Sequence, residues 1–229
     1  MNRSSARYPG IRVLMLMLFL CSGTAVRAQS SDDPAADTQI WPDTQVTVKL
    51  DRNHSLIIHG TIRLGRNNTA FVNEQIGAGL RRAFGRHFSA SINYRYLHSE
   101  PTPIRQQREH RIFVDLTPRI PLGKGFQLQD RNRIEWRDVN NCGCSYRYRN
   151  RIQLERAFNI GEKQLTPYVS SEFFYDTRFR AWNRSQHFVG MRVPLNKHLT
   201  FDGFYMRQID GRVNPGFLHV IGTFLRVEL

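Results

Sequence analysis

Arginine and acidic side chains recur at every second position in the middle of the chain, and their types and spacing are the ones most able to do chemistry. One run reads RNRIEWR from Arg131 to Arg137, and the next reads RYRNRIQLE from Arg147 to Glu155. Guanidinium groups form strong, often bidentate pairs with carboxylates, and they also attract anions. The pattern therefore predicts either an internal network of ion pairs or a surface that binds anions.

Between these charges stand apolar and aromatic residues, among them Ile134, Trp136, Tyr146 and Tyr148. A period of two is typical of a β-strand, whose successive side chains point to opposite faces. One face is then charged and the other mostly apolar. In a barrel that crosses a membrane, the apolar face contacts lipid and the charged face lines the lumen.

The same alternation continues through most of the chain. We count eleven alternating runs, at residues 41–50, 56–64, 73–84, 88–96, 109–120, 126–137, 146–158, 169–175, 184–195, 199–208 and 217–229. Tilted strands of about ten residues are long enough to cross the hydrocarbon. We therefore predict an all-β fold, an antiparallel up-and-down transmembrane β-barrel of about 10–12 strands with an Arg/Glu lumen.

Two details of the pattern do not fit an ideal barrel. Bacterial single-chain barrels have an even number of strands. Ten strands result if run 41–50 is not an ordinary membrane strand, and twelve result if a long segment contains two strands. Asp130 and Asn132 also fall on the side that should face lipid. Their position predicts a bulge or a shift of register in that strand.

The connections alternate in length, with short turns near residues 51, 85, 123, 161 and 196 and longer loops near 65, 99, 140, 178 and 210. Barrels of the outer membrane have short periplasmic turns and longer external loops. Several aromatic residues also fall near strand ends, where an interfacial girdle needs them. Both features favour the membrane barrel.

The first residues resemble a targeting segment. Arg3, Arg7 and Arg12 precede a short apolar stretch, and Val26-Arg27-Ala28 matches a cleavage site. We predict a signal peptide at 1–28, a flexible lead-in at 29–37 and the barrel at 38–229. The predicted location is the outer membrane of a Gram-negative bacterium.

The chain carries a net charge of +14, of which the four arginines of the leader contribute four. Such a charge in a cytosolic protein suggests nucleic-acid binding. Here the arginines are dispersed along strands and the protein is predicted to be exported, so we expect no nucleic-acid partner. The expected partners are outer-membrane lipid, lipopolysaccharide and the machinery that inserts barrels; the pattern leaves the oligomeric state open.

The charged positions that face the predicted lumen define a candidate network. Its members share the inward phase of their strands: Arg111, Asp115, Arg131, Arg133, Glu135, Arg137, Arg147, Arg149, Arg151, Glu155, Glu172 and Arg192. Buried charges must be paired and hydrogen-bonded. We predict no catalytic residue, no metal site and no cofactor.

Two cysteines remain after the leader, Cys142 and Cys144, on either side of Gly143 in a loop between the two charged runs. A disulfide across one residue is strained, because the Cα atoms lie close to the limit for bridging. A loop disulfide formed in an oxidising compartment is the main interpretation. A metal-binding or redox pair, and two free thiols without a role, remain alternatives.

The motifs RxRxExR at Arg131–Arg137 and RxRxR at Arg147–Arg151 combine with PYVSSEFF at Pro167–Phe174 and with Trp41 before a short first hairpin. Together these features resemble an uncharacterised bacterial outer-membrane β-barrel family (domain of unknown function 2490). The resemblance covers nearly all of the mature chain. It implies the barrel fold and the outer membrane, and it implies no activity.

Three functions are compatible with such a barrel. In the first, the Arg/Glu network closes the lumen and the loops or partners carry the function. In the second, the excess of arginine makes a narrow pore that prefers anions. In the third, the protein is an enzyme that acts on lipid or lipopolysaccharide, with a serine and His98, His187 or His219, although no familiar hydrolase motif is present.

A soluble alternative is a secreted, basic β-sandwich or lipocalin-like barrel with its apolar face inward. It requires the arginine rows to face solvent and leaves an unusually aromatic interior.

Overall fold

The computed structural model describes residues 36–229, apart from 103, 141, 162 and 213–215. The predicted signal peptide 1–28 and most of the predicted lead-in 29–37 lie outside these residues. Within them, no helix is long and apolar enough to cross a membrane.

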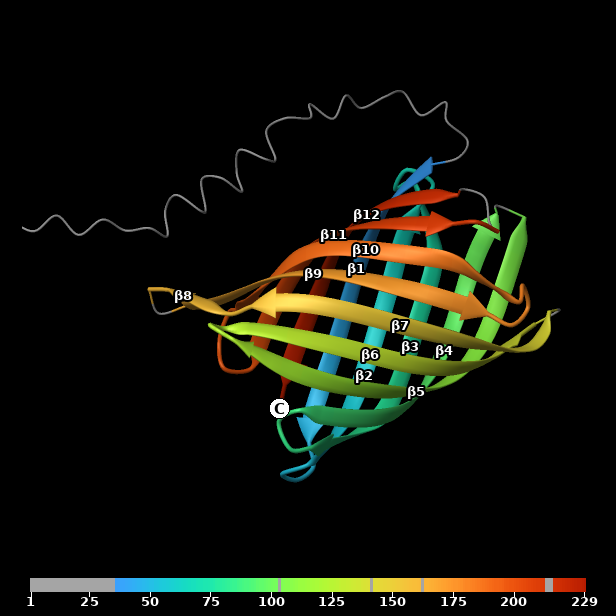
Figure 1. The fold of residues 1–229 in the computed structure, drawn as a ribbon. Coiled ribbons are helices and arrows are strands. Elements are labelled where there is room, and N and C mark those ends of the chain that lie inside the picture. The colour runs from blue at the N-terminus through green and yellow to red at the C-terminus, as the bar shows by residue number, and fades with distance from the viewer. Residues whose placement is uncertain (1–35, 103, 141, 162, 213–215) are drawn as a thin grey trace, which may run out of the picture. The chain divides into compact units, whose positions relative to one another are not determined.

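The described chain forms β-strands throughout its regular structure (Figure 1). The strands are β1 (Ala36–Lys49), β2 (His54–Gly65), β3 (Ala70–Phe84), β4 (Phe88–Thr102), β5 (Arg105–Gly123), β6 (Phe126–Val139), β7 (Gly143–Arg156), β8 (Phe158–Ile160), β9 (Lys163–Asp176), β10 (Ala181–Pro194), β11 (Leu199–Asp210) and β12 (Phe217–Glu228). Neighbouring strands pair in sequence, except that β8 only extends the start of β9. The predicted all-β barrel is confirmed.

The barrel closes between its first and last strands, and this pair is parallel. Among the described residues, eleven strands take part in the closed wall. When consecutive strands are antiparallel, an odd number places the first and last strands in the same direction. The predicted range of about 10–12 strands is confirmed, with the number equal to the eleven runs counted in the sequence. The expectation of an even number, ten or twelve, was wrong, because run 41–50 is a full strand of the wall.

The parallel closure places the two ends of the barrel chain on opposite rims. β1 starts at the rim that also holds the connections near residues 66–69, 140–142 and 177–180, which we call the Ala36 end. β12 finishes at the other rim, which we call the Leu229 end (Figure 1).

Connections at the two rims differ less in length than the sequence predicted. The expected long loop at residues 99–108 is largely strand, because β4 and β5 continue to pair as far as Thr102 and Arg105. Hydrogen bonding in the ladder stabilises these polar segments as strand, although their side chains carry little apolar alternation.

The outer wall of β2 to β5 is aliphatic. Side chains such as Ile58, Ile76, Ile92 and Val114 are exposed there, with 40–64% of their surface free. A contiguous apolar surface of this kind is expected where lipid replaces water. The outward phase of these runs was correctly predicted.

An apolar cluster fills the inside of the barrel next to the parallel seam. Trp41 of β1, Met206 of β11 and Leu218 and Val220 of β12 are buried together, with Phe204 packed against them. Burial of each such side chain contributes on the order of 1.5–3 kcal/mol. The cluster joins strands on both sides of the seam, so it stabilises the one junction that is not a hairpin.

The predicted bulge at Asp130 and Asn132 is wrong. β6 pairs with β7 in continuous register from Phe126 to Val139. On its other side, the shift between β5 and β6 lies at Pro121 and Gly123. Asp130 and Asn132 therefore do face outward, and their environment is described below.

Candidate functional site

Glu135 lies at the centre of the charged lumen. Its side chain is fully buried, and its carboxylate oxygens lie 2.5 Å from Arg147 Nη2, 3.0 Å from Arg149 Nη1, 3.7 Å from Arg133 Nη1 and 3.8 Å from Arg111 Nε. Strands β5, β6 and β7 each contribute to this group. One carboxylate thus lies close to four guanidinium groups. Burying an arginine without such a partner would cost a large free energy of desolvation.

Two further carboxylates extend the network toward the Leu229 end. Glu172 Oε1 accepts hydrogen bonds from Arg131 Nη2 at 2.6 Å and from Arg149 Nε at 2.7 Å. Asp115 accepts two hydrogen bonds from Arg133, at 2.6 and 2.7 Å. The bidentate geometry fixes the plane of the guanidinium as well as its position.

Toward the Ala36 end, Glu109 and Asp176 share Arg137. Glu109 accepts two hydrogen bonds from Arg137, at 2.6 and 2.7 Å, and one from Arg111 at 2.9 Å. Asp176 accepts one from Arg137 at 3.0 Å and contacts Arg178.

We call this connected set the ion-paired network. It comprises seven arginines and five carboxylates, namely Arg111, Arg131, Arg133, Arg137, Arg147, Arg149, Arg178, Glu109, Asp115, Glu135, Glu172 and Asp176.

Three of the predicted members lie outside the ion-paired network. Glu155 pairs with Arg192 near the Leu229 end, where Asp202 of β11 lies 2.9 Å from Arg226. Arg151 donates to Ser170 Oγ at 3.0 and 3.2 Å and contacts no carboxylate of the described residues within 4.0 Å. The remaining nine predicted residues are brought together by the structure.

The sequence interpretation left out lumen residues that share the inward phase. Glu109 and Asp176 complete the network, and both stand an even number of positions from predicted members, Arg111 and Glu172. The aromatic residues Phe113 and Phe174 are also inward, at 2% exposed each. The two-residue period already places all four side chains on the inward face. The sequence analysis did not anticipate aromatic residues inside a charged lumen.

Three arginines of the lumen lie against aromatic rings instead of carboxylates. The guanidinium carbon is 3.7 Å from the ring centre of Trp41 for Arg63, 5.4 Å from that of Phe113 for Arg95, and 4.2 Å from that of Phe188 for Arg151. No carboxylate oxygen of the described residues lies within 4.0 Å of these three, which we call the ring-backed arginines. A ring attracts the cation but, unlike a carboxylate, forms no ion pair with it.

Arg95 shows how such an arginine is positioned. Its Nε donates to His59 Nε2 at 2.8 Å, and its Nη1 donates to Gln75 Oε1 at 2.9 Å. Accepting this hydrogen bond requires an unprotonated Nε2 on His59, so the imidazole adds no charge. Gly77 makes room for the imidazole, since a Cβ there would lie 2.5 Å from His59 Nε2.

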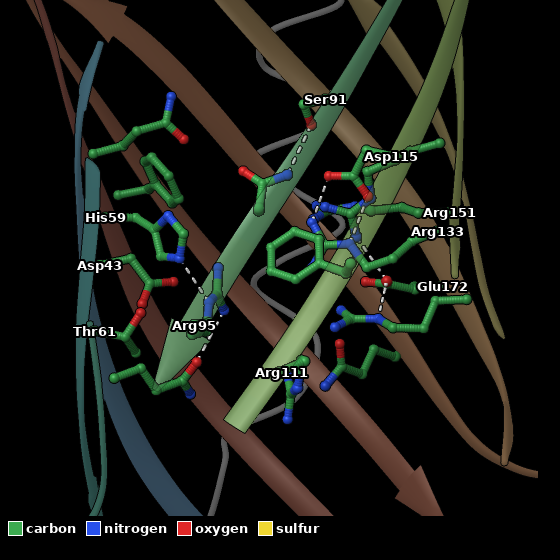
Figure 2. Close-up of a pocket in the computed structure, with 18 of the residues that line it drawn as sticks. Asp43, His59, Thr61, Ser91, Arg95, Arg111, Asp115, Arg133, Arg151 and Glu172 are labelled. Carbon is green, nitrogen blue, oxygen red and sulfur yellow. Dashed lines mark hydrogen bonds and ion pairs between the residues drawn. The ribbon is translucent and has the colours of Figure 1, made fainter. Parts of the chain in front are cut away.

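A cavity of about 1100 Å³ runs inside the barrel between these groups. Figure 2 shows His59 and Arg95 on one side of it and Asp115, Arg133 and Arg151 on the other. Its lining reaches Arg86 at the Leu229 end and Arg178 at the Ala36 end. Among the described lining residues are seventeen arginines and eight acidic residues, so the cavity favours negative charge.

Cys142 and Cys144 are exposed free thiols, so the predicted loop disulfide is not formed in this structure. Cys142 Sγ lies 3.7 Å from Arg105 Nη2, whereas Cys144 Sγ lies 3.9 Å from Asp138 Oδ1. Gly143 between them has a positive φ of 71°, which turns the chain as β7 begins. The two side chains therefore have separate partners. In the described part of the chain, no three metal-binding side chains are grouped to hold an ion.

The histidines considered for an enzyme lie on the outer wall, and one has a serine partner. His187 Nδ1 is 3.0 Å from Ser171 Oγ, while His219 Nδ1 is 2.7 Å from Tyr205 Oη. His98 is opposite Glu74 in the pairing of β3 with β4. No carboxylate of the described residues lies within 4.0 Å of His187.

Solved structures similar to this chain are barrels of bacterial proteins. The β domain of the Bordetella autotransporter BrkA superposes with a TM-score of 0.53 at 9% identity, covering 74% of this chain and 82% of that one. LpxR from Salmonella typhimurium gives 0.47 at 10% identity, with 76% and 83% covered. The translocator domain of the autotransporter NalP from Neisseria meningitidis gives 0.38 at 12% identity, with 72% of each chain covered.

At 9% identity, the likeness to the BrkA domain shows the fold alone. No curated protein matches the sequence. A family model does match it, over residues 38–216. The chain therefore belongs to the family described as protein of unknown function (DUF2490).

Proposed function

We propose that the protein resides in the outer membrane and that its lumen is a narrow passage that prefers anions. Membrane insertion is supported by the aliphatic outer wall of β2 to β5 and by the charged interior, an arrangement that water-soluble barrels invert. The likeness to autotransporter barrels is a likeness of fold and adds no role.

The lining of the cavity carries the proposal of anion preference. Arginines outnumber acidic residues seventeen to eight among its described residues, and they occur from one rim to the other. In the ion-paired network most of this charge is compensated. The ring-backed arginines Arg63, Arg95 and Arg151 are where an anion would find a partner.

A narrow lumen also accounts for the ion-paired network. Long arginine side chains, each held in position by carboxylates, fill one part of the lumen and hold the walls apart there. Because these charges are paired, the arginines do not move freely in the lumen. The network thus acts as a rigid support for the passage.

The first test is fractionation of expressed cells together with gel mobility in detergent, heated and unheated. Enrichment in the outer membrane and a faster unheated band are expected for a folded barrel. A soluble periplasmic protein without a mobility shift would contradict membrane insertion.

The second test is recording from planar bilayers that contain purified, heat-modifiable protein. Small conductance steps whose reversal potential follows the anion gradient are expected. A cation preference would overturn the proposal, and the absence of conductance from inserted barrels would leave a lumen closed by the ion-paired network.

A lipid-acting enzyme has one observation in its favour, the contact between Ser171 and His187. Hydrolysis also needs donors for the developing oxyanion. The strand around Ser171 pairs with β7 on one side and β10 on the other, so its backbone amides are engaged in the ladders. Assaying lipid hydrolysis by the unaltered protein and by His187→Gln tests this function. An enzyme would show activity in the unaltered protein and none in the variant.

A further inference from the structure

Five polar side chains stand together on the outer wall of β6, β7, β9 and β10, where lipid contact is expected. They are Asp130, Asn132, Asn150, Ser171 and His187, and we call them the outer polar belt. Asn132 is the seventh of fourteen residues in β6, and Asn150 is the eighth of fourteen in β7. Ser171 and His187 are likewise near the middle of β9 and β10. The belt is therefore close to half the height of the barrel.

The members of the belt bond to one another across the strands. Asp130 accepts from Asn150 Nδ2 at 2.6 Å and from Asn132 Nδ2 at 3.0 Å. Asn132 Oδ1 in turn accepts from Tyr148 Oη at 2.5 Å and from Asn150 Nδ2 at 3.2 Å. Ser171 and His187 form the neighbouring pair. The first four contacts lie within the β6–β7 hairpin and the last within the neighbouring β9–β10 pair.

The opposite wall shows what an ordinary lipid contact looks like in this protein. Ile58 on β2, Ile76 and Leu80 on β3 and Ile92 on β4 are exposed on this outer face. Hydrocarbon solvates neither amides nor carboxylates, and ionisable residues inside a membrane usually mark a functional contact. Asp130 has no cationic partner within 4.0 Å among the described residues, so hydrocarbon alone is a poor environment for the belt.

We propose that the outer polar belt is covered in the membrane by the same belt of a second copy of this chain. A primary amide both donates and accepts, so a patch centred on Asn132 and Asn150 is complementary to itself. A two-fold axis parallel to the barrel axis brings residues of equal height together, and four of the five members share nearly the same height. Polar side chains of this kind join transmembrane segments to one another.

This dimer depends on insertion into the membrane, but it does not depend on the function of the lumen. The two copies would meet through β6, β7, β9 and β10 and leave the aliphatic wall of β2 to β5 to the lipid. Each barrel keeps its own cavity.

Cysteine cross-linking in isolated outer membranes tests the dimer. The native thiols Cys142 and Cys144 are first replaced by serine, and Ile134→Cys is introduced beside Asn132 on the outer face of β6. Ile76→Cys on β3 is the matched control, since both isoleucines face outward and are 61% and 64% exposed. Oxidation is expected to give a covalent dimer for Ile134→Cys and none for Ile76→Cys.

A second variant links the cross-link to the belt. Asn132→Leu and Asn150→Leu together, in the Ile134→Cys background, are expected to lower the dimer fraction roughly fivefold while the heat-modifiable band remains. A folded barrel with no dimer at Ile134→Cys overturns the proposal. The proposal is also overturned if both cysteines give equal amounts of dimer or if the leucine variant keeps the same dimer fraction. A cross-linked product with the mass of a different protein would overturn it too.

Discussion

The ion-paired network and the ring-backed arginines use the same side chain in the same lumen in two different ways. Around Glu135, four arginines share one fully buried carboxylate, and neighbouring acids fix their orientation. Arg95 instead rests near Phe113 and bonds to the neutral groups of His59 and Gln75. Position in the barrel, and not residue type, decides whether an arginine supports the wall or remains available to a ligand.

The difference lies in the neighbouring strands. β5, β6 and β7 carry inward arginines, and acids on β5, β6 and β9 stand in the same inward phase. Asp115 is opposite Arg133, Glu135 is opposite Arg147, and Arg147 is opposite Asp176, so these cross-strand neighbours are complementary. β3 and β4 offer Gln75, Asn93 and two glycines at the equivalent inward positions. Small and neutral side chains leave space there, and the cavity lies beside them.

The largest effect is expected from removing the centre of the network. Glu135→Gln leaves four guanidinium groups without their shared charge in a buried site, and the loss of one partner of a buried ion pair costs about 3–5 kcal/mol. The temperature at which the unheated gel band disappears, and the midpoint of unfolding in urea, should both fall. Glu74→Gln on the outer face is the control, and equal stability of the two variants would contradict a structural network.

A smaller effect is expected where the two regions meet at Phe113. Its ring lies between Arg95 and Arg133, whose guanidinium carbons are 5.4 and 4.0 Å from its centre. Phe113→Ala creates a cavity, so a loss of about 3 kcal/mol is expected. Phe113→Tyr keeps the ring and should retain most of the stability; if alanine and tyrosine behave alike in urea unfolding, the ring does not link the two regions.

Replacing a ring-backed arginine should affect stability much less. Arg95→Gln removes a cation–ring contact of about 1 kcal/mol, but it also removes an uncompensated buried charge. Unfolding in urea should therefore change by less than it does for Glu135→Gln. A loss as large as that variant's would mean that Arg95 is structural too.

The smallest effect is expected at a charge outside the lumen. Asp51 is exposed in the turn between β1 and β2, where the N–H of Asn53, the imidazole of His54 and the N–H of His54 hold the pKa of its carboxyl at about 2, below the usual 3.8. A lowered pKa stabilises the turn above pH 3.8 and ceases to do so as the pH falls toward 2. Asp51→Asn should thus reduce heat stability slightly at neutral pH and not at pH 2, and a larger difference at low pH would contradict this.

The strands and their faces could be predicted because each inward arginine and each outward isoleucine follows a period of two. The eleven alternating runs correspond to the eleven strands of the wall, but the rule of an even number argued against that count, and the parallel pairing of β1 with β12 explains why the rule does not hold here. The separate partners of Cys142 and Cys144 and the extended β4 and β5 likewise depend on three-dimensional neighbours.

The candidate site was also predicted only in part from the sequence. Nine of the predicted lumen residues form one network because complementary charges on adjacent strands already imply contact. That Arg151 would contact Ser170 and Phe188 instead of an acid could not be read from its own strand. Arg151 faces Glu172 in the pairing of β7 with β9, so the choice of Ser170 and Phe188 depends on side-chain packing and leaves no periodic trace in a single sequence.

The most direct test of an anion-accepting lumen is the reversal potential in planar bilayers across a salt gradient, for the unaltered protein and for a variant with Arg63→Gln, Arg95→Gln and Arg151→Gln. The unaltered barrel should prefer anions, and the variant should lose most of that preference while its heat-modifiable band remains. A cation preference in the unaltered protein, or an unchanged anion preference in the variant, would contradict the distinction between supporting and available arginines.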